Sequence, residues 1–262
     1  MPSDDLNGHN PHEDLDAEIE SIRIIAAVDA EAMFAREVAQ AVKSITDIHD
    51  IANAKILSDT QVASARIAAS GEVHATEIIS AAELLRLNVQ KYEIDSDATE
   101  LLSPSIIKEL AQNTEYDIKH TATAAIRLIK AEAHEAIEQI KTNAKQSIDK
   151  INKITEKVQK QIDENAVIAK SKLESAKQSP RTSQQIKKAA EMAAEKIAAH
   201  AATATHQVNS VVAESVKNVM QAADIACARL EQAIEEVIER IITSRDKAIA
   251  RVEEFRKTRA AF

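Results

Sequence analysis

The side chains that could hold a metal ion or move a proton are histidines, one cysteine and pairs of adjacent glutamates. His9 and His12 stand beside Glu13 and Asp14, and four such groups can bind a cation. They lie in a segment rich in proline, asparagine and glycine, whereas a closed metal site needs three or four ligands held in place. We therefore expect a solvated terminus and no metal site.

The other histidines are spaced wrongly for a shared ion. His200 and His206 are six residues apart and would lie on different faces of a helix. His120 and His134 are fourteen apart, which separates them by about 21 Å along a helix axis. His74 continues an otherwise apolar line at eleven-residue spacing, and we expect it to reach solvent from the edge of a helix seam. The rest of that line is Ala30, Ala41, Ala52, Ala63 and Leu85.

Cys227 is the only cysteine, which excludes an intramolecular disulfide and any site with several cysteine ligands. It continues a line of apolar residues at eleven-residue spacing, formed by Val216, Ile238 and Ile249. Free cysteine is usually buried, so we expect Cys227 to be a small buried hydrophobic residue.

The glutamate pairs at residues 235–236 and 253–254 do not form an acid and base set. Sequence neighbours on a helix point about 100° apart, and basic residues three or four positions away make these pairs solvated faces. Gly8 and Gly71 are the only glycines, so no phosphate-binding glycine loop is possible. We expect no catalytic, cofactor-binding or metal-binding residues, and no enzyme activity.

The elements that carry these residues are defined by an apolar repeat of eleven residues. Eleven residues make three helical turns, so a stripe with this period stays on one side of a nearly straight helix. The stripe is the predicted packing and assembly surface, and it runs through the whole chain in three series. Its residues are Phe34, Ile45, Ile56, Ile67, Ile78 and Val89, then Ile118, Ile129, Ile140, Ile151, Ile162 and Leu173, then Ile186, Ile197, Val208, Val219, Leu230, Ile241 and Val252.

Two breaks in the pattern predict three helices of roughly 75–80 residues, each about 110–120 Å long. Ser103-Pro104 and Ser179-Pro180 stand at the breaks, and serine before proline is typical of a helix N-cap. Ser70-Gly71 permits a kink or local fraying without ending the first helix. The expected organisation is a disordered tail at 1–12, helices at 13–92, 105–178 and 184–262, a connection at 93–104 and a turn at 179–183, in one helical domain.

Short connections favour antiparallel neighbours. The predicted fold is therefore all-α, with three very long hendecad helices in an antiparallel up-down-up bundle or coiled-coil-like rod. An alternative remains open, in which the breaks are kinks and the helices find their partners in other chains. An Ile and Val stripe of this length needs a partner in either case.

Charge and hydropathy exclude several function classes. The net charge of −9 argues against nucleic acid. Residues 13–91 hold 7 basic and 14 acidic residues, whereas residues 105–177 hold 13 and 11, which is compatible with pairing in one bundle. The longest apolar run, at residues 24–28, is too short to span a bilayer, and the acidic start does not fit a secretion signal. We expect a cytoplasmic protein.

The sequence favours a non-enzymatic structural or interaction protein that forms homo-oligomers, in a filament, a sheath or a scaffold. One alternative is a coat on a lipid or granule surface, because the chain is similar in period to apolipoproteins and synucleins. Another is a stalk or adaptor between other proteins, since the period and alanine content resemble the peripheral stalk subunits of rotary ATP synthases. Those bacterial subunits begin with a membrane span, which we do not find here.

Overall fold

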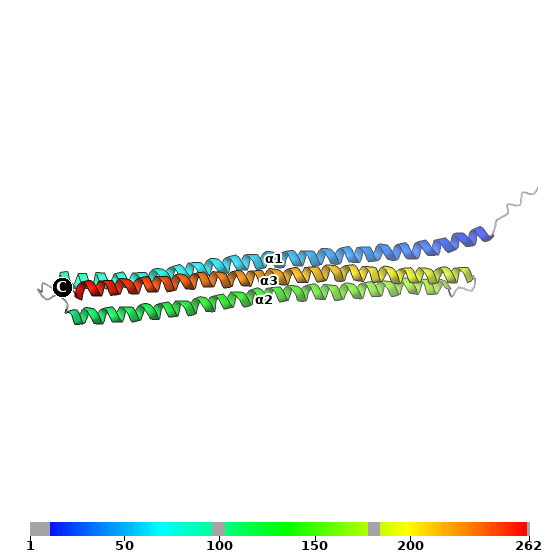
Figure 1. The fold of residues 1–262 in the computed structure, drawn as a ribbon. Helices are drawn as coiled ribbons and strands as arrows, with labels where there is room; N and C mark the ends of the chain where they lie inside the picture. Colours follow the sequence, from blue (N-terminus) through cyan, green and yellow to red (C-terminus); the bar gives the residue numbers. More distant parts are fainter. Residues whose placement is uncertain (1–10, 96–102, 178–183, 261–262) are drawn as a thin grey trace, which may run out of the picture. The chain divides into compact units, whose positions relative to one another are not determined.

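The computed structural model describes residues 11–95, 103–177 and 184–260, and all of them except Ser103 are helical. The three helices are α1 (Pro11–Asp95), α2 (Pro104–Lys177) and α3 (Gln184–Ala260), each drawn as an unbroken ribbon in Figure 1. They pack as a three-helix bundle, which confirms the predicted fold class. Most of the expected tail and of the two connections lies outside the described residues.

The start of α2 shows how the backbone groups of a helix end are satisfied. The amides of Ile106 and Ile107 donate to the carbonyl oxygen of Ser103 at 2.9 and 3.2 Å. Pro104, at the first helical position, has no amide hydrogen that would need a partner. The Ser103 hydroxyl lies 2.8 Å from that of Ser105. Ser103 therefore satisfies two of the first amides of α2, and Pro104 has none to satisfy.

Gly71 does not interrupt α1, and no described glycine has a positive φ. A Cβ atom placed on Gly71 would overlap Val237 Cγ1 of α3 and lie 3.3 Å from Val237 Cβ. The sequence suggested a kink or fraying at this point, but the structure places a close helix approach there. Gly71 therefore provides space for Val237.

The chain forms two compact units, and each contains a segment of all three helices. Unit 1 comprises α1 up to Ile51, α2 from Gln146 and α3 up to Val219. Unit 2 comprises α1 from Ala52, α2 up to Lys145 and α3 from Met220. In both units the α2 segment runs antiparallel to the segments of α1 and α3 (Figure 1).

The core of unit 1 joins branched aliphatic residues to alanines. Small alanine side chains let the helix axes approach toward the short end of the usual 8–10 Å range. Each fully buried isoleucine contributes about 1.5–3 kcal/mol relative to an exposed one. The buried cluster contains Phe34 and Ile45 of α1, Ile151, Ile162 and Leu173 of α2, Ile197 and Val208 of α3, and alanines that include Ala30, Ala41, Ala190, Ala193 and Ala204.

Unit 2 has the same kind of core together with polar contacts between α1 and α2. Ile67, Ile78, Ile129 and Ile241 are buried there. The buried Thr60 hydroxyl donates to the Ile56 carbonyl oxygen at 2.6 Å, so this polar group is satisfied within its own helix.

Candidate functional site

All nineteen residues of the eleven-residue stripe are buried, and none is more than 4% exposed. In unit 1 the stripe residues of all three helices meet in one cluster. In unit 2 the stripe residues Ile56 of α1, Ile140 of α2 and Leu230 of α3 are also buried. A partner molecule cannot reach these side chains while the bundle is closed. Any binding surface must therefore lie on the outside of the helices.

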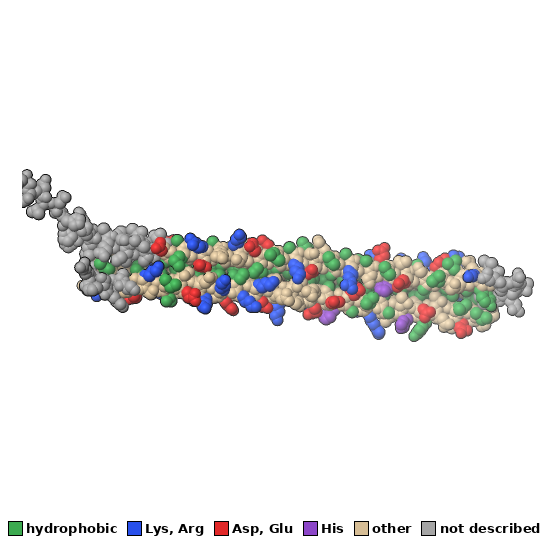
Figure 2. Space-filling view, turned by 180° about the vertical axis from the view of Figure 1, so that it is seen from behind, with side chains coloured by type: hydrophobic (Ala, Val, Ile, Leu, Met, Phe, Trp, Pro, Cys, Tyr) green, Lys and Arg blue, Asp and Glu red, His purple; other side chains and the backbone are tan. Residues whose placement is uncertain are grey.

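The outer surface mixes charged and apolar side chains. On the face shown in Figure 2, acidic and basic groups are interspersed with hydrophobic ones. Several large hydrophobic residues are exposed, and among the side chains that the structure describes more of them belong to unit 2 than to unit 1. Those of unit 1 are Met33, Ile51, Val167, Ile168 and Met192, whereas those of unit 2 are Leu57, Val62, Val73, Leu84, Leu87, Tyr92, Ile106, Leu110, Tyr116, Leu128, Met220 and Ile225.

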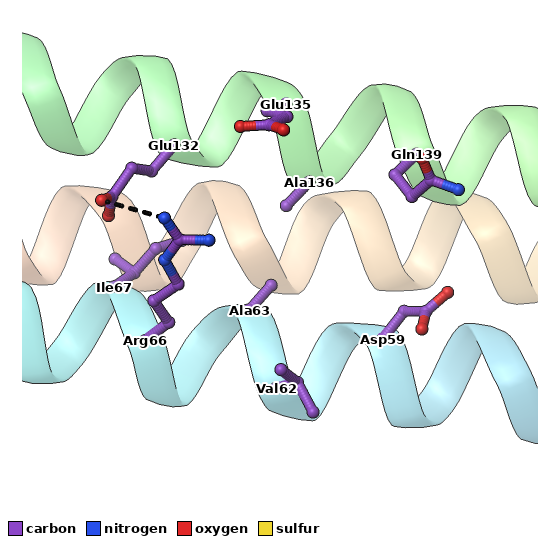
Figure 3. Close-up of a pocket in the computed structure, with 9 residues that line it drawn as sticks. All are labelled: Asp59, Val62, Ala63, Arg66, Ile67, Glu132, Glu135, Ala136 and Gln139. Atoms are coloured by element: carbon purple, nitrogen blue, oxygen red, sulfur yellow. Dashed lines mark hydrogen bonds and ion pairs between the residues drawn. The ribbon is translucent and has the colours of Figure 1, made fainter.

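A groove of about 260 Å³ lies between α1 and α2 in unit 2 (Figure 3). Arg66 reaches from α1 to Glu132 of α2, with 3.5 Å between the guanidinium nitrogen and the carboxylate oxygen. Ala63 and Ala136 lie between the two helices farther along the groove (Figure 3). The ionisable side chains that line the groove are those of Asp59, Arg66, Glu132 and Glu135, and no histidine, cysteine, serine or threonine is among its described lining residues.

A polar cluster around Asn143 joins α1 to α2 next to this groove. The Asn143 amide nitrogen donates to Asp59 Oδ2 at 2.8 Å. The Asn143 amide oxygen accepts hydrogen bonds from Lys55 Nζ and from Gln139 Nε2, each at 3.1 Å. Asn143 is buried, so these bonds replace those it would make with water. The cluster aligns two helices, and it was not predicted from the sequence.

Two carboxylate oxygens in unit 2 are shielded from solvent and have no hydrogen-bond partner, namely Glu132 Oε2 and Glu115 Oε1. The other Glu132 oxygen accepts from Arg66, so the charge of this group is partly compensated. Among the described residues, no group of three or more histidine, cysteine, aspartate or glutamate side chains is arranged to hold a metal ion.

The expected burial of Cys227 is wrong, because the thiol is only half-buried. Val216, Ile238 and Ile249, which share its register, are half-buried as well. Position 227 lies eight residues beyond a stripe residue, which turns it about 65° away from the core centre. Burial raises the pKa of the Cys227 thiol, while the nearby Lys141 ammonium acts in the opposite direction. A reactive cysteine needs a lowered pKa, so Cys227 does not have the setting of a nucleophile.

The histidines do not converge on one another over the part of the chain that the structure describes. His74 is half-buried, and its Nδ1 lies 3.0 Å from Glu77 Oε2, one turn along α1. His120 is exposed and stacks on Tyr116 of the same helix, with 6.2 Å between the ring centroids. His134 and His206 are exposed on their helices, and His9 lies outside the described residues. These positions fit surface roles.

Exposed ion pairs shift two further pKa values. The hydrogen bond from Arg86 lowers the pKa of Glu83, and the hydrogen bond to Glu138 raises the pKa of Lys141. Each partner stands three residues away on the same helix, so these contacts support the individual helices and not their packing. None of α1, α2 and α3, as far as they are described, has an apolar stretch that could span a bilayer.

Comparisons with known proteins support the fold alone. No protein-family model matches the chain, and no curated protein matches it significantly. Among solved structures, the chain is similar to a computationally designed three-helix bundle, with a TM-score of 0.54 and 14% sequence identity. The match covers 94% of this chain and 97% of the designed one. A similarity at this level of identity supports the three-helix bundle and carries no information on function.

Proposed function

We propose that this chain is a non-enzymatic structural protein of the cytoplasm, whose helical bundle self-associates through its outer surface. The observation that carries the proposal is the set of large apolar side chains that stay exposed after the bundle has closed. Val62, Tyr116 and Val167 are each about two-thirds exposed. Apolar side chains that gather in a contiguous exposed patch are typical of an interface. Filaments, sheaths and scaffolds are the assembled forms that we consider.

The buried stripe weighs against a coat on a lipid or granule surface. An amphipathic helix binds lipid through its apolar face, and here the most apolar face of each helix is occupied by the other two. Lipid binding by this face would require the bundle to open. The exposed apolar residues of unit 2 need no such rearrangement to meet a protein partner.

Multi-angle light scattering and negative-stain electron microscopy, over a range of concentration and salt, test the proposal. We expect an average mass that rises above the 28.6 kDa of one chain as concentration increases, and ordered assemblies on the grid. A mass of one chain under all conditions would contradict self-association. An increase in helicity on adding liposomes, together with loss of the oligomers, would support the lipid-surface alternative instead.

A further inference from the structure

The outward face of α1 in unit 2 carries no charge over thirty residues. We call this surface the α1 outer face, and all nine of its residues are exposed. Val62, Val73, Leu84 and Leu87 are 66%, 56%, 55% and 46% exposed. At 1.5 Å per residue the face is about 45 Å long. Its residues are Ser58, Val62, Ala65, Ala69, Val73, Thr76, Ser80, Leu84 and Leu87.

The other two helices of unit 2 carry charged residues at several of the positions that correspond to this face. At the same sequence offsets from its own buried stripe, α2 exposes Glu109, Arg127, Glu135 and Glu138. Likewise, α3 exposes Glu236, Glu239, Lys247 and Glu254. An exposed helix face in water is ordinarily patterned with such charges. The α1 outer face is therefore the helix face of unit 2 that lacks this solvent-facing character.

The α1 outer face has the spacing of a helix-packing seam. Its residues follow one another at steps of four and three, as the apolar residues of a helix pair do. Ala65 and Ala69, together with Ser58 and Ser80, leave room for another helix to approach closely. We infer that this face binds the same face of a second copy of the chain, in an antiparallel pair with two-fold symmetry. This inference rests on the proposed self-association.

In an antiparallel pair, the order of residues makes the α1 outer face complementary to the same face of the second copy. With Val73 opposite Val73 of the second copy, Leu84 lies directly opposite Val62, and Leu87 lies within one residue of the level of Ser58. Nearer the axis, Ser80 lies within one residue of the level of Ala65, and Thr76 within one residue of the level of Ala69. On either side of the central pair of Val73 residues, each larger side chain thereby meets a smaller one, which favours interdigitated packing of the two helices. A two-fold pair of identical surfaces of this kind gives a closed dimer.

Charges along one edge of the face support the same arrangement. Arg66 and Glu77 lie on one edge, and antiparallel pairing brings the same edges of both helices together, so Arg66 approaches Glu77 of the second copy. Arg66 is 68% exposed and Glu77 55% exposed, although each also pairs within its own chain. On the other edge Glu72 approaches its own symmetry mate. That repulsion weakens the dimer, and we expect Glu72→Gln to tighten it.

A charge placed at the centre of the face tests the inference. Val73→Glu should raise the dimer dissociation constant by at least about tenfold, because it places two like charges on the symmetry axis. Ile225→Glu is the matched control, since Ile225 of α3 is 55% exposed and lies outside the face. Sedimentation equilibrium measures association, and circular dichroism melts check that each variant stays folded.

The outcomes separate this inference from the proposed function. A monomeric Val73→Glu protein beside an associating Ile225→Glu protein would support it. Equal association of the wild type and Val73→Glu, or equal loss in both variants, would overturn the α1 outer face and leave self-association standing. A wild-type chain that stays monomeric at every concentration would overturn both proposals.

Cysteine cross-linking tests the antiparallel register in a Cys227→Ser background. Ala69→Cys protein mixed with Thr76→Cys protein should form disulfide-linked dimers, whereas neither protein should do so alone. Efficient cross-linking of Ala69→Cys with itself would indicate parallel helices and would overturn the proposed arrangement. Ile225→Cys serves as the control for random collision between exposed thiols.

Discussion

The same helix has two different outer faces in the two units, although its inner face is alike in both. In unit 1 the outward positions of α1 include Arg36, Lys43 and Asp47, and all three are exposed. The matching positions of α1 in unit 2 hold uncharged residues. Ala69 lies twenty-two residues after Asp47, and Thr76 lies thirty-three residues after Lys43. Packing within the bundle determines which residue types the inner face of α1 carries. The outer face is free of that requirement, so its composition reflects whether water or a partner surrounds it.

The largest expected effect comes from the inner face, where the two units should respond alike. Ile45 in unit 1 and Ile78 in unit 2 are both fully buried. Replacing either with alanine removes buried methyl groups and leaves a cavity, so each variant should lose about 2–5 kcal/mol in the free energy of unfolding. Urea denaturation followed by circular dichroism measures the loss in each variant.

Exposed apolar residues provide the control for this pair. Met33→Ala in unit 1 and Leu57→Ala in unit 2 remove comparable side chains from the surface, and each should change the unfolding free energy by about 0.5 kcal/mol or less. If Ile45→Ala cost no more than Met33→Ala, the inner stripe of unit 1 would not be the core of the bundle.

A smaller effect, confined to unit 2, is expected where α1 and α3 approach most closely. Gly71→Ala should favour the helical conformation of α1 by about 1 kcal/mol. The added methyl group should, however, overlap the side chain of Val237, which has one preferred rotamer in a helix. Overpacking of this kind costs about 1–3 kcal/mol, so we expect a net loss of stability in urea denaturation.

The double variant Gly71→Ala/Val237→Ala distinguishes overlap from other causes. It should be more stable than the sum of the two single effects predicts, because the shorter side chain at position 237 relieves the contact. Strict additivity would show that Gly71 and Val237 do not constrain one another. A stabilising Gly71→Ala would mean that α1 and α3 are farther apart than described.

The smallest effect concerns the edge of the unit 2 core, where Cys227 is half-buried. Burial raises the thiol pKa, so iodoacetamide should react more slowly with the folded protein than with the urea-unfolded protein at the same mildly alkaline pH. The rate should increase as pH rises. Because the folded pKa is above the unfolded one, the unfolded chain loses its proton first and stability falls slightly over that pH range.

A cysteine on the open surface provides the comparison for Cys227. Thr123→Cys in a Cys227→Ser background places the thiol at an exposed position of α2. It should react at nearly the same rate folded and unfolded. If Cys227 also showed equal rates, its neighbours in unit 2 would not shield it.

The fold class could be predicted from apolar residues that repeat along each helix, whereas burial at the edges of the core could not. The all-α bundle of three long helices was predicted from the eleven-residue period and the proline breaks. The burial expected for Cys227 was wrong, because its line follows the same period but lies about 65° from the core centre. Period alone does not distinguish the middle of a seam from its edge.

The Asn143 cluster was missed for a different reason. Asn143, Asp59 and Lys55 are ordinary surface residue types, and 84 positions separate Asn143 from Asp59 in the chain. Only the register of α2 against α1 brings them together. The uncharged face of α1 left a signal in the sequence, because Val62, Val73 and Leu84 repeat at eleven residues. Spacing alone does not show whether a second stripe faces a neighbouring helix or solvent.

The sequence by itself determined that the chain is helical, where its helices break and which residues repeat along each helix, because these properties depend on local backbone preferences and period. The tertiary structure decided that the stripe is satisfied within one chain, that Gly71 accommodates Val237 and that the second stripe of α1 faces outward. These properties depend on which helix lies against which, and at what register. A repeat of similar units leaves that choice open until side chains such as Asn143 and Val237 meet their partners.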